Sequence, residues 1–163
     1  MSLLLSPSVL TLILALQLIH TLQAMLYSEN RRVINIKMFT SSHQNMRRSC
    51  AAFSNVNLYT SSKLEVEKDY SFASGVFSVK AEVEKPIWEQ HILDTINMMY
   101  DKSTKSFYFN ILSSLSDEKL QREHLYYGDS SFFLSYCIKN FSREVRLDHS
   151  YDLYEFTISA LKG

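Results

Sequence analysis

The sequence is poor in the residue types that interrupt or cross-link a chain. Its 163 residues include 3 Gly, 2 Pro and 2 Cys. So few glycines and prolines argue against collagenous, low-complexity and turn-rich all-β proteins. Two cysteines are too few for a disulfide framework or a thiolate zinc site. The glycines also stand far apart, which excludes the Walker loop and the glycine-rich dinucleotide fingerprint.

Apolar residues are plentiful, whereas charge is unevenly distributed. Hydrophobic residues make up 46% of the chain and aromatic residues 13%, enough for one folded domain with an appendage. Residues 1–62 hold five Lys or Arg and one acid, a net charge of +4, while residues 63–163 hold 12 basic and 16 acidic residues, a net charge of −4. Because phosphate neutralisation needs a basic face, nucleic acid is not expected as a partner of this acidic body.

The first 28 residues carry no charged side chain. As a helix, Leu3 to Leu26 is about 36 Å long at 1.5 Å per residue, enough to cross a hydrocarbon core of about 30 Å. The segment 1–28 is therefore interpreted as a retained transmembrane anchor. Its apolar positions include Leu3, Val9, Leu12, Leu16, Ile19 and Leu26.

Two other interpretations of this segment stay open. A cleaved signal peptide would need a basic start and a small-x-small cleavage site, and neither is present. A buried core helix is the second, although 28 residues without charge is long for one. Gln17 and His20 share a helical face and are candidate contacts to a partner helix, or else polar residues tolerated near an interface.

Residues 29–62 are basic and rich in serine, and they are interpreted as a juxtamembrane linker. Alternation within Val33 to Phe39 predicts a short strand there. Met38 to Ser49 resembles the composition of an organellar transit peptide, with Arg and Ser present and acids absent.

The folded body is expected over residues 63–163. Two alternating runs, Lys63–Phe72 and Val76–Glu84, flank a turn with Gly75 and predict an antiparallel hairpin. Phe107 to Ile111 predicts a third strand. The fold class is therefore α+β: an N-terminal transmembrane helix, then a small antiparallel sheet covered by several helices.

Four helices complete this expectation. Pro86 opens one through Tyr100 with Trp88, Ile92, Thr95, Ile96 and Met99 inward, and Ser116 starts one that stops at Gly128. Asp129 or Ser130 caps a third with Phe133, Tyr136, Cys137 and Phe141 inward. A last one follows Asp148 to Ser150, with Leu153, Phe156, Ala160 and Leu161 inward.

No site for metal, cofactor or catalysis is predicted. Asp148, His149 and Asp152 could place two ligands on one helix face, but a metal needs three or four. Cys137 could pair with His91 or His124, although it lies on a predicted inward face where thiols are inert. Glu123 with His124 is the least unsuitable acid–base pair, and an exposed helical turn is the alternative.

Aromatic residues gather late in the chain and suit either an interface or a small core. The candidate interaction residues among them are Tyr126, Tyr127, Tyr151 and Tyr154.

These observations favour a non-catalytic, membrane-anchored accessory or scaffold subunit of a larger membrane assembly. The acid-poor stretch points to the mitochondrial inner membrane, and membrane lipid and other membrane subunits are the expected partners. A secreted or luminal binding protein with a cleaved signal peptide is the alternative, and a small enzyme is the second alternative.

Orientation follows from the basic flank. Arg31, Arg32 and Lys37 follow the apolar segment, so the body is expected on the cytosolic or matrix side. On that side Asn140, in the sequon Asn140-Phe141-Ser142, stays unglycosylated, and Cys50 and Cys137 stay reduced and unbridged.

Overall fold

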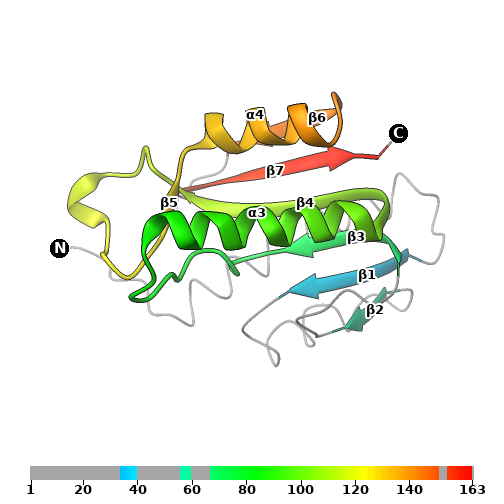
Figure 1. The fold of residues 1–163 in the computed structure, drawn as a ribbon, viewed down its shortest axis with the longest axis horizontal. Coiled ribbons are helices and arrows are strands. Elements are labelled where there is room, and N and C mark those ends of the chain that lie inside the picture. Colours follow the sequence, from blue (N-terminus) through cyan, green and yellow to red (C-terminus); the bar gives the residue numbers. More distant parts are fainter. Residues whose placement is uncertain (1–33, 40–55, 60–66, 151–153, 163) are drawn as a thin grey trace.

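The structure is a computed structural model, and it describes residues 67–150 and 154–162 together with the backbone of residues 34–39 and 56–59. Seven strands of this described part form one sheet in the order β2-β1-β3-β4-β7-β6, with β5 paired to β4 (Figure 1). The elements are β1 (Ile34–Phe39), β2 (Val56–Tyr59), β3 (Lys68–Ala73), α3 (Lys85–Lys102), β4 (Ser103–Ser113), the short 3-10 helix η1 (Glu118–Leu120), β5 (Tyr127–Gly128), α4 (Ser130–Asn140), β6 (Val145–Asp148) and β7 (Glu155–Leu161).

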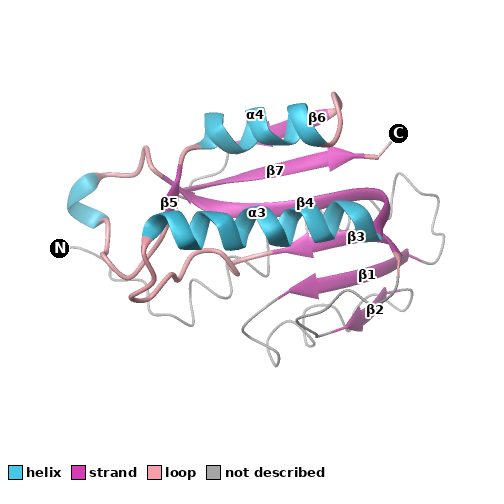
Figure 2. Cartoon of the chain, in the orientation of Figure 1, coloured by secondary structure: helices cyan, strands magenta, loops and turns pink. Residues whose placement is uncertain are grey.

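The sheet is mixed, and its larger part is parallel. The pairs β1–β2, β1–β3, β3–β4 and β4–β5 are parallel, whereas β7 runs antiparallel to β4, and β6 to β7 (Figure 2). The predicted fold, a small antiparallel sheet behind a transmembrane helix, is therefore wrong. A parallel pair needs a crossover, and α3 supplies it between β3 and β4.

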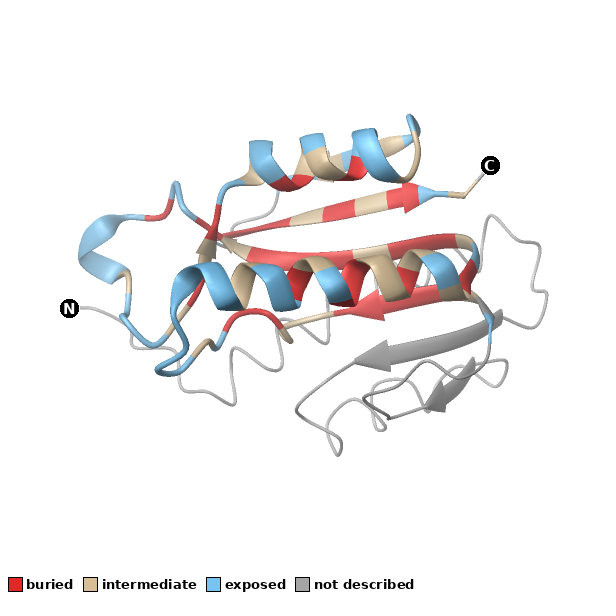
Figure 3. Cartoon of the chain, viewed as in Figure 1, coloured by how far each residue is buried: buried red, intermediate tan, exposed pale blue. Residues whose placement is uncertain are grey.

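The helices α3 and α4 pack on the same face of the sheet. Tyr100 of α3 meets Phe107 edge-on at a centroid distance of 6.1 Å, and Phe133 of α4 meets Phe109 at 6.2 Å. Phe107 and Phe109 are two residues apart in β4, so their side chains point to one face. Figure 3 shows the buried residues of both helices on the side that faces the sheet.

Three predicted elements have the type of secondary structure that the sequence predicted. The helix expected from Pro86 is α3, and its buried residues are Ile92, Thr95, Ile96 and Met99. The helix capped by Asp129 is α4, with Phe133 and Cys137 buried. The strand predicted over Phe107–Ile111 is the centre of β4.

The predicted hairpin is wrong. Its first half contains β3, which lies between β1 and β4 and is parallel to both. Its second half is not a strand but a loop that begins at Gly75, whose φ is 66°. Phe77 in this loop is buried, but Val79 and Val83, both expected in the core, are 55% and 37% exposed.

Two predicted helices are also wrong. The helix expected to run from Ser116 to Gly128 is replaced by η1 and β5. The helix expected after Asp148 to Ser150 is replaced by β7, which pairs with β4 and β6. The buried apolar residues of β7 are Phe156, Ile158 and Ala160, a period of two.

The sheet extends across the boundary that composition predicted at residue 62. Both β1 and β2 come from the expected linker 29–62, and β1 includes most of the predicted strand Val33–Phe39. Among the described residues no helix is long and apolar enough to cross a membrane. The expected anchor, with Leu3, Val9, Leu12, Leu16, Ile19 and Leu26, lies outside the described residues.

Candidate active site at the carboxyl edge of the parallel strands

The carboxyl ends of the parallel strands β1, β3 and β4 meet at one edge of the sheet. In open sheets of this kind ligands bind at that edge. The helices α3 and α4 begin on the same side, and so does β7, because it is antiparallel to β4 and Glu155 stands opposite Leu112. In Figure 1 this edge lies on the side of the molecule where β5 and the adjoining loops are drawn.

A buried polar pair occupies this edge. Asn110 is 6% exposed and Glu155 is 3% exposed. The Asn110 side-chain amide nitrogen donates to Glu155 Oε1 over 3.1 Å, and its Oδ1 accepts from the backbone N–H of Gly75 over 2.8 Å. One amide therefore joins β4, β7 and the loop after β3.

Glu155 is a buried titratable group at this edge. Burial raises the pKa of its carboxyl to about 7, and the hydrogen bond from Asn110 offsets this only in part. The ion pair found among the described residues joins Lys85 and Glu89, so no described cation neutralises Glu155. A buried carboxyl that can take up and release a proton near pH 7 is a candidate acid–base group.

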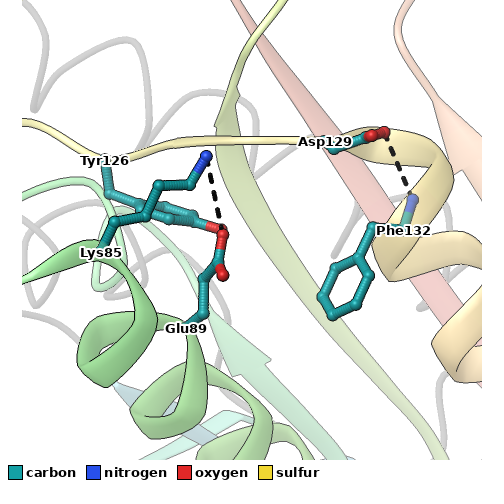
Figure 4. A network of polar contacts seen from close by, with 5 residues as sticks. All are labelled: Lys85, Glu89, Tyr126, Asp129 and Phe132. Carbon is teal, nitrogen blue, oxygen red and sulfur yellow. Dashed lines mark hydrogen bonds and ion pairs between the residues drawn. The ribbon is translucent and has the colours of Figure 1, made fainter.

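A second polar set joins the start of α3 to the segment before α4. The Tyr126 hydroxyl donates to Glu89 Oε1 over 2.9 Å, and Lys85 Nζ lies 3.8 Å from the same oxygen (Figure 4). Burial and the Glu89 carboxylate raise the pKa of Tyr126 far above its usual range, so the hydroxyl stays a donor. Asp129 Oδ1 accepts from the backbone N–H groups of Ser131 and Phe132 over 2.8 and 3.3 Å, which caps α4.

Backbone contacts fix the loops around the pair. The N–H of Ser113 donates to the carbonyl of Tyr154 over 2.8 Å, and that of Ser114 to the carbonyl of Gly128 over 2.9 Å. The Tyr154 hydroxyl donates to Asp117 Oδ2 over 3.3 Å. The start of β7 is thereby tied to the end of β4, which holds Glu155 in place.

The tyrosines predicted as interaction residues take different positions. Tyr126 is 1% exposed and belongs to the core, whereas Tyr154 is 53% exposed. Tyr127 is half-buried, and its hydroxyl accepts from the backbone N–H of Arg122 over 3.1 Å. Tyr151, Gln17 and His20 lie outside the described residues.

The residues weighed for metal and thiol chemistry do not converge. No three or more His, Cys, Asp or Glu residues gather as a metal site within the described part of the chain, and Asp152 lies outside it. Cys137 is a free, buried thiol whose pKa burial raises to about 12, so it serves as a small core residue. Glu123 and His124 are both exposed.

Sequence reasoning missed Asn110 and Glu155. Asn110 stands within the apolar run Phe107–Leu112, and Glu155 is the first residue of the alternating stretch Glu155–Leu161; both stretches become strands. A polar residue in such a run is the available signal, because a buried polar group needs a partner.

Comparison with known proteins shows which folds and sequences this chain resembles. No family model matches the chain. A protein of Mycobacterium tuberculosis with the name "Putative methyltransferase Rv1506c" is 38% identical over 109 residues, which is 67% of this chain and 66% of that relative. The solved structure of magnesium protoporphyrin IX methyltransferase from Synechocystis PCC 6803 with bound SAH superposes with a TM-score of 0.62 at 8% identity, covering 93% of this chain and 84% of that one. The same enzyme with bound SAM gives a TM-score of 0.56.

The chain has the fold of these methyltransferases. The comparison overturns the interpretation as a non-catalytic accessory subunit, because both the relative and the solved neighbours are named for a catalysed reaction. That interpretation depended on the lack of a recognisable reaction site. The expected partners and compartment stay predictions.

The methyl donor of the solved neighbours, S-adenosylmethionine (SAM), does not fit the first two strands of this chain. Doubly wound sheets that bind adenine dinucleotides have a glycine-rich turn after the first strand, for close approach of the backbone, and an acid further on that binds the ribose. No glycine precedes Gly75, and no acid occurs from Asn30 to Leu64. The buried polar pair described above lies instead on β4 and at the start of β7.

Proposed function

We propose that the chain works in methyl transfer and that its β3–β7 part holds the methyl acceptor. The observation that carries the proposal is the buried Asn110–Glu155 pair at the carboxyl edge of a methyltransferase-like sheet. The 38% identity to a protein named as a methyltransferase supports it.

The chemistry of the pair suits an acceptor. A nitrogen, oxygen or sulfur atom that receives a methyl group gives up the proton it carried, and a carboxyl with a pKa of about 7 can accept that proton near neutral pH. Asn110 holds Oε1 of Glu155, which fixes the direction of the carboxyl group. Burial excludes water and strengthens the contact to a bound N–H or O–H.

The loop after β3 is a partly exposed neighbour of the pair. Ser74 and Gly75 are both partly exposed, and the Gly75 N–H is the group bound by Asn110. A small molecule at this loop is therefore next to the buried pair. A neutral acceptor with a transferable proton is the class that the site favours, because a carboxylate there would repel an anion.

The test is capture of the acceptor by the full chain. Wild-type protein is incubated with a small-molecule extract, and retained compounds are identified by mass spectrometry. Glu155→Gln should lose the compound that the wild type retains, because a neutral amide accepts a weaker hydrogen bond from the N–H or O–H of the compound than a carboxylate does. The matched control is Glu144→Gln, which changes an exposed glutamate and should retain it.

The methylated form of the captured compound gives the second measurement. It lacks the proton that Glu155 accepts, so it should bind more weakly than the compound itself. The proposal fails if the wild type retains nothing, or if Glu155→Gln retains the compound as well as Glu144→Gln does.

A further inference from the structure

The edge beside β1 is where a doubly wound sheet would hold a nucleoside. The chain continues from β1 to β2, which lies on one side of β1 in the sheet. β3 lies on the other side of β1. In the register, Ile36 of β1 stands opposite Leu58 of β2 and Tyr70 of β3, so the three strands are parallel neighbours. This reversal of strand order is the topological switch point at which such folds bind their ligand.

The sequence after β1 and β2 lacks the residue types that this binding needs. A glycine-rich turn lets the backbone approach the ligand, and an acid roughly 20 residues further on binds the ribose hydroxyls. Here β1 is followed by Thr40-Ser41-Ser42-His43-Gln44-Asn45, and Thr60 stands where the acid would be, directly after β2.

Charge works against the ligand too. Residues 30–64 hold no acid and six basic residues: Arg31, Arg32, Lys37, Arg47, Arg48 and Lys63. SAM carries a positively charged sulfonium, and a net charge of +6 over these residues disfavours a cationic ligand. The product SAH has no sulfonium, so it separates this effect from the lack of glycines.

We infer that this chain does not bind free SAM or SAH, in contrast to the solved methyltransferase whose fold it shares. The methyl group of the proposed transfer is then supplied by a donor bound to another polypeptide, and this chain holds the acceptor. The inference does not depend on the acceptor site, because Asn110 and Glu155 lie on β4 and β7.

Isothermal titration of the full chain with SAM, and separately with SAH, tests the inference. We expect no saturable heat from either ligand at millimolar concentration. A dissociation constant in the micromolar range for either ligand overturns the inference. The acceptor-capture experiment uses no donor, so its failure and the failure of this titration are independent.

A gain-of-binding variant tests the stated cause. Thr40→Gly, Ser42→Gly and Asn45→Gly together create the spacing G-x-G-x-x-G after β1, and Thr60→Asp adds the acid after β2. The control carries Thr40→Ala, Ser42→Ala, Asn45→Ala and Thr60→Asn, and circular dichroism checks that both variants stay folded. Saturable SAH binding by the first variant alone supports the inference. Failure of the folded first variant to bind SAH overturns the stated cause, the missing glycines and acid.

Discussion

The side-chain amide of Asn110 donates to the carboxyl of Glu155 over 3.1 Å, and both side chains are almost fully buried. The contact joins a parallel strand to the antiparallel strand that ends the described chain. It also places a titratable group where open α/β sheets bind their ligands.

Glu155→Gln should remove a pH dependence of stability. Burial raises the folded-state pKa of Glu155 to about 7 from 4.5, so between these values the folded protein binds more protons than the unfolded one. Stability contributed by this group therefore falls as pH rises from 4.5 to 7, by about 3 kcal/mol at 1.36 kcal/mol per pKa unit.

Urea unfolding of the wild type and of Glu155→Gln at pH 5 and pH 8 checks this. Relative to the wild type, Glu155→Gln should have a higher free energy of unfolding at pH 8 than at pH 5. Glu144→Gln is the control, and it should follow the wild type at both values. An equal difference between wild type and Glu155→Gln at the two pH values would contradict the raised pKa.

Asn110→Ala should destabilise the protein by about 2–3 kcal/mol, because it leaves both the Glu155 carboxyl and the Gly75 N–H without their partner. Asn140→Ala is the comparison, since that amide donates to the carbonyl of Tyr136 at an exposed position. It should cost less than 1 kcal/mol. Unfolding midpoints at one pH measure both, and equal losses would argue against a structural role for the buried amide.

Tyr126→Phe should cost about 1 kcal/mol, because it removes a buried hydroxyl that donates to Glu89 while keeping the ring. Tyr154→Phe removes an exposed hydroxyl and should change stability by less than 0.5 kcal/mol. A double-mutant cycle with Glu89→Ala gives the coupling directly, and additive losses would show that the Tyr126–Glu89 contact contributes nothing.

The sequence predicted α3 and α4 well because each carries local signals. Pro86 suits the first turn of a helix, and Asp129 caps one with two backbone hydrogen bonds. Ile92, Ile96 and Met99 then recur at helical spacing and are buried. Nothing outside these segments is needed to predict them.

The sheet was harder to predict because strand pairing is not local. Alternation at Val76–Glu84 matched a strand, but the segment forms only an isolated antiparallel bridge from Val79 to Leu125, and Ala81 adopts a φ of 51°. Phe156 and Ala160 fit a helical spacing, yet Ile158 between them makes the same residues fit a strand. Neither pattern reveals that β4 would pair with β3 on one side and β7 on the other.

The candidate site could be anticipated only in part. Asn110 and Glu155 are 45 residues apart, and their contact depends on the register of β4 with β7. The sequence marks Asn110 as a polar residue within an apolar run and Glu155 as the start of an alternating stretch, but it does not show that the two side chains meet. The missing glycines were visible from the start, because Gly75 is the first in the chain.

Gly75 gives the last prediction, because its backbone is in the left-handed region. Its φ is 66°, and its N–H donates to Asn110 Oδ1 over 2.8 Å. Alanine at this φ costs about 1–2 kcal/mol, whereas asparagine tolerates the left-handed region better than other residues with a side chain. Gly75→Ala should therefore destabilise the protein more than Gly75→Asn does. Thermal melts of the two variants rank them, and an equal or reversed order would show that the loop after β3 relaxes away from this conformation.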